Sequence, residues 1–363
     1  MAHIRNIAST ILHDERRTWW HFPLAALSFL YGGVMRLRNL LYDRGIRRSY
    51  RLPCKVISVG NITVGGTGKT PLIIMLARML REEGYRPAVL CRGYRGESRS
   101  PVNVVSDGTA LLMTPRDAGD EPVLIARNLG HIPVITGRKR YLTGRQAIEE
   151  FGADLLLLDD AFQHRRVRRD IDILLLDSVK PFGNGFMLPR GILREPVTSM
   201  KRATLIVETG SRKEGTTPPA QFLRTGHHPP QPLYRGHHAP RDLVKGTSGE
   251  SLPLDRIRGK SLCLFSGIAE PERFRTTVAS LGGEILEHVT FPDHHSFTEA
   301  DLARVRDTAR TCGAGMIVTT EKDGIKLFDF PDSVKDIYIL RIEMEILPSR
   351  GTLRAIVLEQ LTQ

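Results

Sequence analysis

Cysteine and aromatic residues are scarce in this sequence. The chain of 363 residues contains four cysteines, and no two of them stand close enough for a CxxC pair or a zinc knuckle. We interpret them as reduced thiols of a cytosolic protein, without a chemical role. Aromatic residues make up only 6% of the chain, and both tryptophans lie near its amino end. This composition argues against a channel in which the bases of a long polynucleotide would stack.

Acidic residues are also in deficit. There are 40 of them against 52 lysines and arginines, so the formal charge is +12. Such a chain favours anionic partners: nucleic acid, anionic lipid or phosphorylated substrates. Its length predicts two or three domains and excludes a peptide hormone, a disulfide miniprotein and a fibrous repeat.

Charged residues are absent from Thr18 to Met35, a run of 18 residues between two arginines. This length only reaches the lower limit for a membrane-spanning helix, and Pro23 and the pair Gly32-Gly33 interrupt the apolar run. Tryptophans and flanking arginines are typical of a helix at the level of the lipid headgroups. We therefore expect residues 1–50 to form an amphipathic, membrane-associating helical segment. A packed helix and a true span remain the alternatives.

From residue 51 to 210, short strand-like runs alternate with helix-length amphipathic segments, which predicts a mostly parallel sheet covered by helices. The predicted strands are Lys55–Val59, Pro87–Cys91, Ile132–Thr136, Asp154–Leu158, Asp172–Leu176 and Thr204–Glu208. Predicted helices are Lys69–Glu83, Asp120–Leu129 and Lys139–Phe151.

Proline, glycine and histidine become frequent in residues 211–258, which we interpret as a linker of turns with a possible hairpin. Its two His-His pairs lack a carboxylate or cysteine ligand at a fitting spacing, so they argue little for a metal site. Residues 259–363 return to the α/β pattern and predict a second, smaller α/β domain. Its expected elements are Lys260–Phe265, Pro271–Leu281, Glu284–Val289, Thr298–Thr311, Met316–Thr319 and Ile337–Leu340.

A glycine-rich turn between a predicted strand and a predicted helix carries the clearest chemical signal. It has the context of a P-loop, in which backbone N–H groups face phosphate oxygens. Lys69 would reach the β- and γ-phosphates, and the Thr70 hydroxyl would ligate magnesium. The motif departs from the usual pattern at Thr63, where a glycine is expected. The predicted nucleotide-binding residues are Thr63, Val64, Gly65, Gly66, Thr67, Gly68, Lys69 and Thr70.

Two carboxylates end the leucine run of the strand Asp154–Leu158. Asp159 and Asp160 would lie where an open parallel sheet places its ligands, and two adjacent carboxylates repel each other without a cation. We predict that this pair holds Mg²⁺, and the sequence does not decide which of the two ligates the ion directly.

The motifs of another P-loop class, the GTPases, are missing. A GTPase would carry DxxG and NKxD, but Asp160 is followed by Ala161, and Thr320-Glu321-Lys322-Asp323 has the wrong spacing. The residues alone leave open a kinase, a nucleotide-dependent switch that binds a protein partner, or a nucleic-acid-dependent ATPase.

Six motifs in order resemble the tetraacyldisaccharide 4′-kinase family, the lipid A 4′-kinases of Gram-negative bacteria, and the resemblance extends over nearly the whole chain. They are Gly60-Asn61 with Thr63 through Pro71, Arg92-Gly93-Tyr94, Gly119-Asp120-Glu121-Pro122, Asp159 through His164, Leu193-Arg194-Glu195-Pro196 and Phe291-Pro292-Asp293-His294. The family commonly has a hydroxyl residue at the position of Thr63. The resemblance implies ATP- and Mg²⁺-dependent phosphorylation of the 4′-hydroxyl of tetraacyldisaccharide 1-phosphate, forming lipid IVA.

The resemblance also implies roles for single residues. Asp120 would be the catalytic base, supported by His294, with His295 as the alternative, and Lys69 would act on the transferred phosphoryl group. Arginines suit the substrate's 1-phosphate through their forked donors. The candidates for binding the lipid headgroup are Arg92, Tyr94, Arg140, Gln163, His164 and Arg194.

The expected partners are the lipid A disaccharide precursor and anionic lipids of the inner membrane, at whose cytoplasmic face the protein would be peripheral or monotopic. Neither nucleic acid nor an obligate protein partner is expected.

Overall fold

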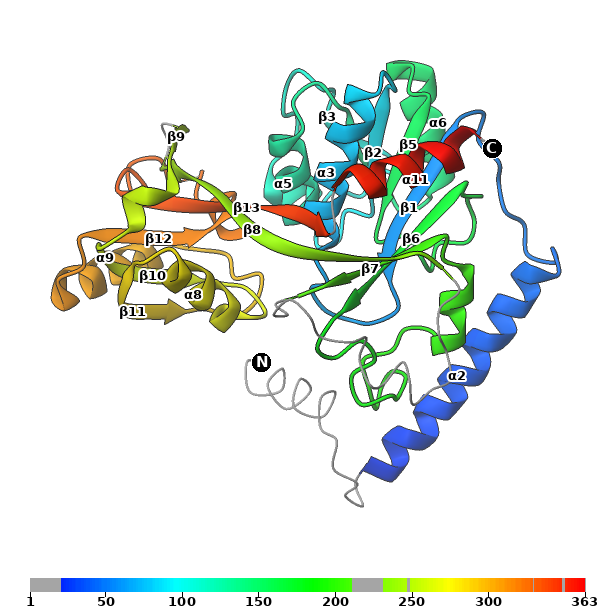
Figure 1. Ribbon diagram of the computed structural model, residues 1–363, viewed down its shortest axis with the longest axis horizontal. Helices are drawn as coiled ribbons and strands as arrows, with labels where there is room; N and C mark the ends of the chain where they lie inside the picture. Colours follow the sequence, from blue (N-terminus) through cyan, green and yellow to red (C-terminus); the bar gives the residue numbers. More distant parts are fainter. Residues whose placement is uncertain (1–20, 211–230, 247–248, 329, 348–349, 363) are drawn as a thin grey trace.

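The computed structural model describes residues 21–210, 231–246, 249–328, 330–347 and 350–362. Its strands form one continuous sheet in the order β11-β10-β12-β13-β8-β7-β6-β1-β5-β2-β4-β3, with β9 (Glu250–Leu252) paired to β8. Helices cover this sheet in two groups, so the chain has two α/β units (Figure 1). The predicted fold class is therefore confirmed.

The larger unit, here called the P-loop unit, is built on parallel strands except for β3, which runs antiparallel to β4. Its strands are β1 Lys55–Asn61, β2 Pro87–Cys91, β3 Asn103–Ser106, β4 Val134–Thr136, β5 Leu155–Asp159, β6 Ile171–Asp177 and β7 Leu205–Thr209. Successive leucines of β5 enter two different cores, one on each face of the sheet. This double burial explains why the strand is an uninterrupted apolar run.

Helices of the P-loop unit follow the apolar periodicity of the sequence. They are α3 Lys69–Glu82, α4 Pro115–Ala118, α5 Asp120–Asn128, α6 Arg140–Phe151 and the 3₁₀ helix η1 Val197–Arg202. Helices α3 and α5 pack on one face of the sheet, and α6 packs on the other. Helix α3 begins after the carboxyl end of β1, and the residue before α5, Gly119, lies against the Tyr94 carbonyl just after β2. The first residues of both helices thus lie near the carboxyl ends of the strands.

The smaller unit, here called the C-terminal unit, has its own two apolar cores. Its elements are η2 Leu254–Ile257, β10 Ser261–Ser266, α8 Pro271–Ser280, β11 Glu284–Thr290, α9 Glu299–Cys312, β12 Met316–Thr320, α10 Glu321–Gly324 and β13 Ile337–Leu347. Strands β10 to β13 are parallel to their neighbours within this unit. These elements follow the order that the sequence predicts.

Strand β8 (Leu233–Lys245) connects the two units, because it pairs in parallel with β7 and then antiparallel with β13 over most of its length. Figure 1 shows β8 and β13 crossing from one unit to the other. We expected turns and a possible hairpin in residues 211–258. Strands β8 and β9 do pair antiparallel there, but β8 itself is a strand of 13 residues where turns were expected. The proline and histidines of β8 are typical of turns, so the sequence did not indicate a strand. Residues 211–230 lie outside the described residues.

Helix α11 (Arg350–Thr362) corrects the expected extent of the second domain. Leu353, Val357 and Leu361 are buried in the same core as α3 and β1, and the helix lies over the P-loop unit in Figure 1. The expected domain 259–363 therefore ends with β13, after which the chain returns to the first unit.

Helix α2 (His21–Asp43) lies along the flank of the P-loop unit (Figure 1). Hydrogen bonds to the P-loop unit hold one face of the helix. Among them, Ser28 Oγ donates to the Met187 carbonyl at 2.8 Å, Tyr31 Oη to the Arg194 carbonyl at 3.1 Å, and Asn39 Nδ2 to Glu195 Oε2 at 2.9 Å. The described helix extends beyond the predicted apolar run, to Asp43. Trp19 and Trp20 lie outside the described residues.

The other face of α2 exposes large apolar side chains, namely Phe22, Leu27, Phe29, Leu30, Val34, Leu37 and Leu40. Within the described ranges, the length and hydropathy needed to cross a bilayer are found in no helix.

The position of α11 predicts a specific sensitivity. Leu353 is fully buried, so Leu353→Ala should leave a cavity and lower the free energy of unfolding by about 3 kcal/mol. Leu112 is 55% exposed, and Leu112→Ala should change it by less than about 0.5 kcal/mol. Urea denaturation of the full chain measures both, and equal effects would contradict the packing of α11.

Candidate active site

The P-loop connects the central strand β1 to α3. Gly65 and Gly68 have φ values of +126° and +78°, so the loop uses backbone conformations that glycine adopts without strain. Gly68 is the N-cap of α3 and has no side chain to occupy the free N–H groups of the first turn. This helix start is therefore open to an anion, as the sequence predicts.

Contacts on both sides fix the shape of the loop. Asn61 Nδ2 donates to Thr67 Oγ1 at 3.1 Å, and Thr209 Oγ1 of β7 donates to the Thr67 carbonyl at 2.8 Å. Strand β8 contacts the loop from another direction, because a Cβ atom added to Gly68 would lie 2.5 Å from His238 Nε2. Strand β8 thus brings a histidine of the unpredicted strand against the nucleotide loop.

Residues Ile192–Arg194 run beside the loop, because the Val64 amide donates to the Ile192 carbonyl at 2.8 Å and the Arg194 amide donates to the Ile62 carbonyl at 2.7 Å. This pairing brings Arg194 to the end of β5. Its Nη1 donates to both carboxylate oxygens of Asp160 at 2.9 Å, and Lys69 Nζ lies 3.5 Å from Oδ1. Lys69 and Arg194, both predicted site residues, thus contact the same carboxylate, that of the predicted Mg²⁺ ligand Asp160.

The pKa values of the two neighbouring carboxyl groups are shifted in opposite directions. Burial raises the pKa of Asp160, but Lys69 and Arg194 outweigh it, and the net pKa lies below its ordinary value. Burial, with Glu121 and Asp160 nearby, raises the pKa of Asp159 to about 7. Asp159 Oδ1 is buried and has no hydrogen-bond partner among the described residues. A site with an unpartnered buried carboxylate oxygen fits a hard cation.

Asp120, the first residue of α5, faces the C-terminal unit. His294 Nδ1 lies 3.0 Å from Asp120 Oδ2, and Lys326 Nζ lies 3.6 Å from the same oxygen. Burial raises the pKa of Asp120, but the His294 hydrogen bond and the charges of Lys326 and Lys322 bring it below its ordinary value. Asp120 is thus an ionised carboxylate, as a base must be.

The adjacent His295 has a different environment. Its Nε2 lies 3.0 Å from Asp301 Oδ2, and its ring stacks on Phe291 with centroids 4.8 Å apart. His294 has a φ of +61°, and this turn directs the two neighbouring side chains to opposite partners. Of the two histidines, the geometry therefore favours His294 as the partner of Asp120.

Comparisons with known proteins identify the family. The family model of tetraacyldisaccharide-1-P 4′-kinase matches residues 20–362. The chain belongs to this family. The tetraacyldisaccharide 4′-kinase of Syntrophus aciditrophicus is 50% identical over 336 residues, covering 90% of both chains, and that of Desulfatibacillum aliphaticivorans is 38% identical over 354 residues, covering 95% of both.

A solved structure is similar over nearly the whole chain. The crystal structure of LpxK from Aquifex aeolicus in complex with ATP superposes with a TM-score of 0.76 at 31% identity, covering 93% of this chain and 98% of that one. The predicted family, kinase activity and fold are thus confirmed. The roles of the single site residues stay predictions.

The predicted lipid-headgroup residues of this 4′-kinase family member lie at different depths. Arg92 and Tyr94 are exposed just after β2, and the Tyr94 carbonyl would lie 2.4 Å from a Cβ atom added to Gly119. Their loop thus contacts the backbone that precedes Asp120. Gln163 Nε2 donates to the Asn61 carbonyl at 2.8 Å, which places it beside the P-loop.

Arg140 does not support its predicted role. It is 3% exposed, and its guanidinium donates to the carbonyls of Cys91, Gly137 and Asp159 at 2.7, 2.5 and 3.0 Å. These bonds hold the ends of β2 and β5 together behind the site. Sequence reasoning took the arginine for a ligand because it cannot distinguish a buried guanidinium from an exposed one.

Two groups escaped the sequence analysis. Glu121 raises the pKa of Asp159 and so belongs to the acidic cluster, and its place beside Asp120 was the available signal. Lys322 and Lys326 approach the Asp120–His294 pair from the other unit, and only the fold brings them there.

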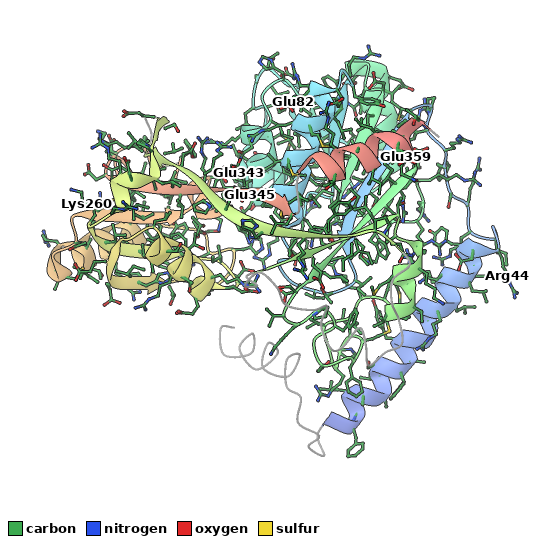
Figure 2. The ribbon with its side chains drawn as sticks, in the orientation of Figure 1. Arg44, Glu82, Lys260, Glu343, Glu345 and Glu359 are labelled. Carbon is green, nitrogen blue, oxygen red and sulfur yellow. The ribbon has the colours of Figure 1, made fainter. Side chains whose placement is uncertain are left out.

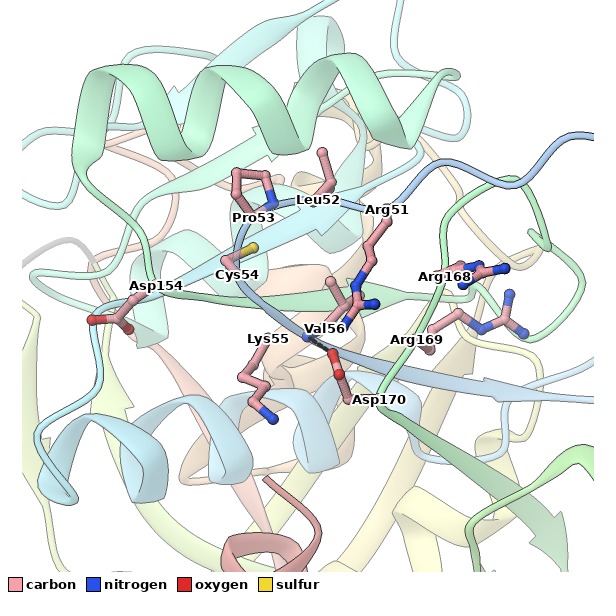
Figure 3. Close-up of a pocket in the computed structure, with 10 residues that line it drawn as sticks. All are labelled: Arg51, Leu52, Pro53, Cys54, Lys55, Val56, Asp154, Arg168, Arg169 and Asp170. Atoms are coloured by element: carbon pink, nitrogen blue, oxygen red, sulfur yellow. Dashed lines mark hydrogen bonds between the residues drawn. The ribbon is translucent and has the colours of Figure 1, made fainter. Parts of the chain in front are cut away.

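A hollow of about 580 Å³ lies at the opposite end of the sheet. Figure 3 shows it between the segment before β1 and the loop before β6, with Arg51, Arg168 and Asp170 around it. It lies at the amino ends of β1 and β5, away from the P-loop. Among the described residues, no cluster of three or more His, Cys, Asp or Glu side chains is placed to hold a metal ion, and His237 pairs with Glu345 (Figure 2 labels Glu345 on β13).

His164 makes stability depend on pH. Burial, together with Arg140 and Arg169, lowers its pKa from 6.5 to about 4. The unfolded chain therefore takes up a proton below pH 6.5 that the folded protein takes up only near pH 4, so stability falls as the pH falls through this range. Because His164 is only partly buried, we expect a loss of about 1 kcal/mol between pH 7.5 and 5.

His164→Asn removes this titrating group, so the variant should lose about 1 kcal/mol less than the wild type over the same interval. Urea midpoints at the two pH values measure the difference. Parallel losses in the two proteins would contradict the neutral, buried state of His164.

Proposed function

We propose that this chain transfers the γ-phosphoryl group of ATP to the 4′-hydroxyl of tetraacyldisaccharide 1-phosphate, forming lipid IVA. The observation that carries the proposal is the Asp120–His294 contact of 3.0 Å. It joins the two units near the carboxyl ends of the parallel strands, where the P-loop also lies. A nucleotide switch needs no such base. A kinase needs one within reach of the acceptor hydroxyl.

The phosphates of ATP would bind the P-loop backbone at the start of α3, with Lys69 against the β- and γ-phosphates. Arg194 and Lys69 both contact Asp160 in this structure, so a γ-phosphate arriving there would find two cations already in place. Thr70, Asp159 and Asp160 would hold Mg²⁺, and the unpartnered Asp159 Oδ1 supports this assignment. The ion would neutralise charge on the β- and γ-phosphate oxygens.

The transfer itself conserves atoms and charge. The 4′-hydroxyl loses its proton to the Asp120 carboxylate while its oxygen bonds to the γ-phosphorus. The bond from that phosphorus to the bridging oxygen breaks, and its electron pair leaves with ADP. Arg92, Tyr94, Gln163 and His164 remain proposed contacts of the lipid headgroup. Arg194, predicted as a further headgroup contact, pairs with Asp160 here and is proposed to face the γ-phosphate.

Two substitutions test the transfer. Asp120→Asn should lower kcat for lipid phosphorylation by about 100-fold or more, with nucleotide binding retained. Lys69→Ala should lower it by at least about 100-fold, because it removes charge stabilisation of the transferred group. Transfer of ³²P from labelled ATP to the lipid in detergent micelles measures both.

The exposed ion pair of Lys335 and Asp332 provides matched controls, and Asp332→Asn and Lys335→Ala should retain wild-type rates. A folded wild type that binds ATP but labels no lipid would exclude the proposal and favour a nucleotide switch.

We also propose that α2 attaches the chain peripherally to the cytoplasmic face of the inner membrane. Its exposed apolar face supports this, since Phe22, Leu30 and Leu37 are 72%, 67% and 57% exposed. A hollow of about 480 Å³ adjoins the end of α2 and is lined by Arg47, Arg48, Arg165, Arg168, Arg169 and Arg202. Arg44 projects from the same end of the helix (Figure 2). Anionic lipid headgroups match this charge.

Replacing two residues of the apolar face tests the attachment. Leu30→Glu with Leu37→Glu should weaken partition into vesicles containing anionic lipid by at least about tenfold, because both side chains would enter the interface. Leu112→Glu, also exposed but on the P-loop unit away from α2, is the control and should partition like the wild type. Vesicle sedimentation measures binding, and equal partition of the three proteins would contradict the attachment.

A further inference from the structure

Two lysines that follow β12 face the Asp120–His294 pair. Lys322 Nζ lies 3.2 Å from His294 Nε2 and 3.1 Å from Asp293 Oδ1. Lys326 Nζ lies 3.6 Å from Asp120 Oδ2, and its side chain is only 8% exposed. Both belong to the segment Thr320–Lys326, which includes the Thr-Glu-Lys-Asp motif that the proposed mechanism does not use.

This segment is held rigidly from several directions. Asp323 is fully buried, and its carboxylate accepts hydrogen bonds from the Gly267 amide at 2.8 Å, the Thr320 hydroxyl at 2.8 Å and Lys326 Nζ at 3.1 Å. The Gly267 carbonyl in turn accepts from the His294 amide at 3.0 Å. The same buried aspartate therefore fixes the position of Lys326 and, through Gly267, the backbone of His294.

A second contact ties the segment to the P-loop unit. Asn128 Nδ2, at the end of α5, donates to Glu321 Oε1 at 2.7 Å. Helix α5 is thus held by the C-terminal unit at both ends, by His294 at Asp120 and by Glu321 at Asn128. Lys322 is the next residue after Glu321 and is positioned by this contact.

The chemistry of an ammonium group decides the proton on His294. A lysine ammonium has three donors and no acceptor, so His294 Nε2 must accept from Lys322 and carry no proton. The proton then lies on Nδ1, which donates to Asp120 Oδ2. Asp293 Oδ2, at 3.7 Å, would favour a proton on Nε2, but Lys322 is closer to Nε2 and neutralises Asp293.

We propose that Lys322 is a positioning residue that fixes the Nδ1–H tautomer of His294, and that Lys326 holds Asp120 as the carboxylate that receives the hydroxyl proton. This inference rests on the proposed kinase function. In it, His294 donates to the base and does not itself receive the proton. The lysines act through His294 and Asp120 and need not touch the lipid.

The tautomer can be observed directly. In full-length protein labelled with ¹⁵N-histidine, His294→Asn identifies the His294 signals, and long-range ¹H–¹⁵N spectra report which ring nitrogen carries the proton. The wild type should show Nδ1–H with Nε2 unprotonated. Lys322→Met should place a proton on Nε2, because Asp293 then loses its cation, and Lys322→Arg should keep the wild-type pattern.

The same variants separate positioning from binding. Lys322→Met should lower kcat by about tenfold or more and change the KM for ATP by less than about twofold, while Lys322→Arg should recover most of the loss. Lys335→Met, which removes an exposed lysine of the same unit, is the control and should match the wild type. An unchanged tautomer or an unchanged kcat in folded Lys322→Met would overturn the role of Lys322.

Lys326→Met tests the second lysine through the pH profile of kcat/KM. The groups facing Asp120 are His294, Lys322 and Lys326 from the C-terminal unit and Glu121 on its own helix. Loss of one cation should raise the pKa of Asp120, so the acid limb should move to higher pH. An unmoved limb would overturn this part. If the wild type phosphorylates no lipid, the proposed function fails, whereas the tautomer spectra still decide the role of Lys322.

Discussion

The pairing of β8 with β13 is the constraint on which the site depends. Because β8 also continues the sheet through β7, the C-terminal unit is joined to the P-loop unit by a continuous hydrogen-bonded ladder. A ladder has a fixed register, so the side of the second unit that carries His294 and Lys326 is brought against the start of α5. The return of α11 adds an apolar attachment, because it packs in the same core as α3, α5, β8 and β13.

The sequence predicted those elements whose residue pattern follows from a local requirement, such as burial on both faces of the sheet or a positive φ angle. The run Leu155–Leu158 is apolar because both faces of the sheet are covered, and the positive φ angles of the loop favour glycine at Gly65 and Gly68. Strand β8 could not be predicted, because a strand between two units need not alternate and tolerates Pro240 at a register shift. The apolar periodicity of α11 shows which of its faces is buried but not which core that face enters, because the choice of core depends on long-range packing.

The site could be predicted where a residue's role is local. The Lys69–Thr70 start of a helix and the acid pair after β5 identify themselves by their position next to a strand. Arg140 was misread because burial is a property of the fold, and its three carbonyl partners come from separate segments. Lys322 gave no signal for the same reason, since its partner His294 lies 28 residues earlier and meets it only through the parallel strands.

The cations of the site are distributed unevenly among its three aspartates. Asp160 is balanced by Lys69 and Arg194, and Asp120 by Lys326 with the hydrogen bond from His294. Asp159 is buried beside these acids, and Arg140 contacts its backbone carbonyl and leaves its Oδ1 without a partner. Burial, with the nearby carboxylates of Glu121 and Asp160, outweighs the charges of Lys69 and Arg140 and raises the pKa of Asp159 to about 7. The protein's own cations thus lie against Asp160 and Asp120, whereas the buried Asp159 Oδ1 has no hydrogen-bond partner among the described residues, and on this difference the proposed magnesium site rests.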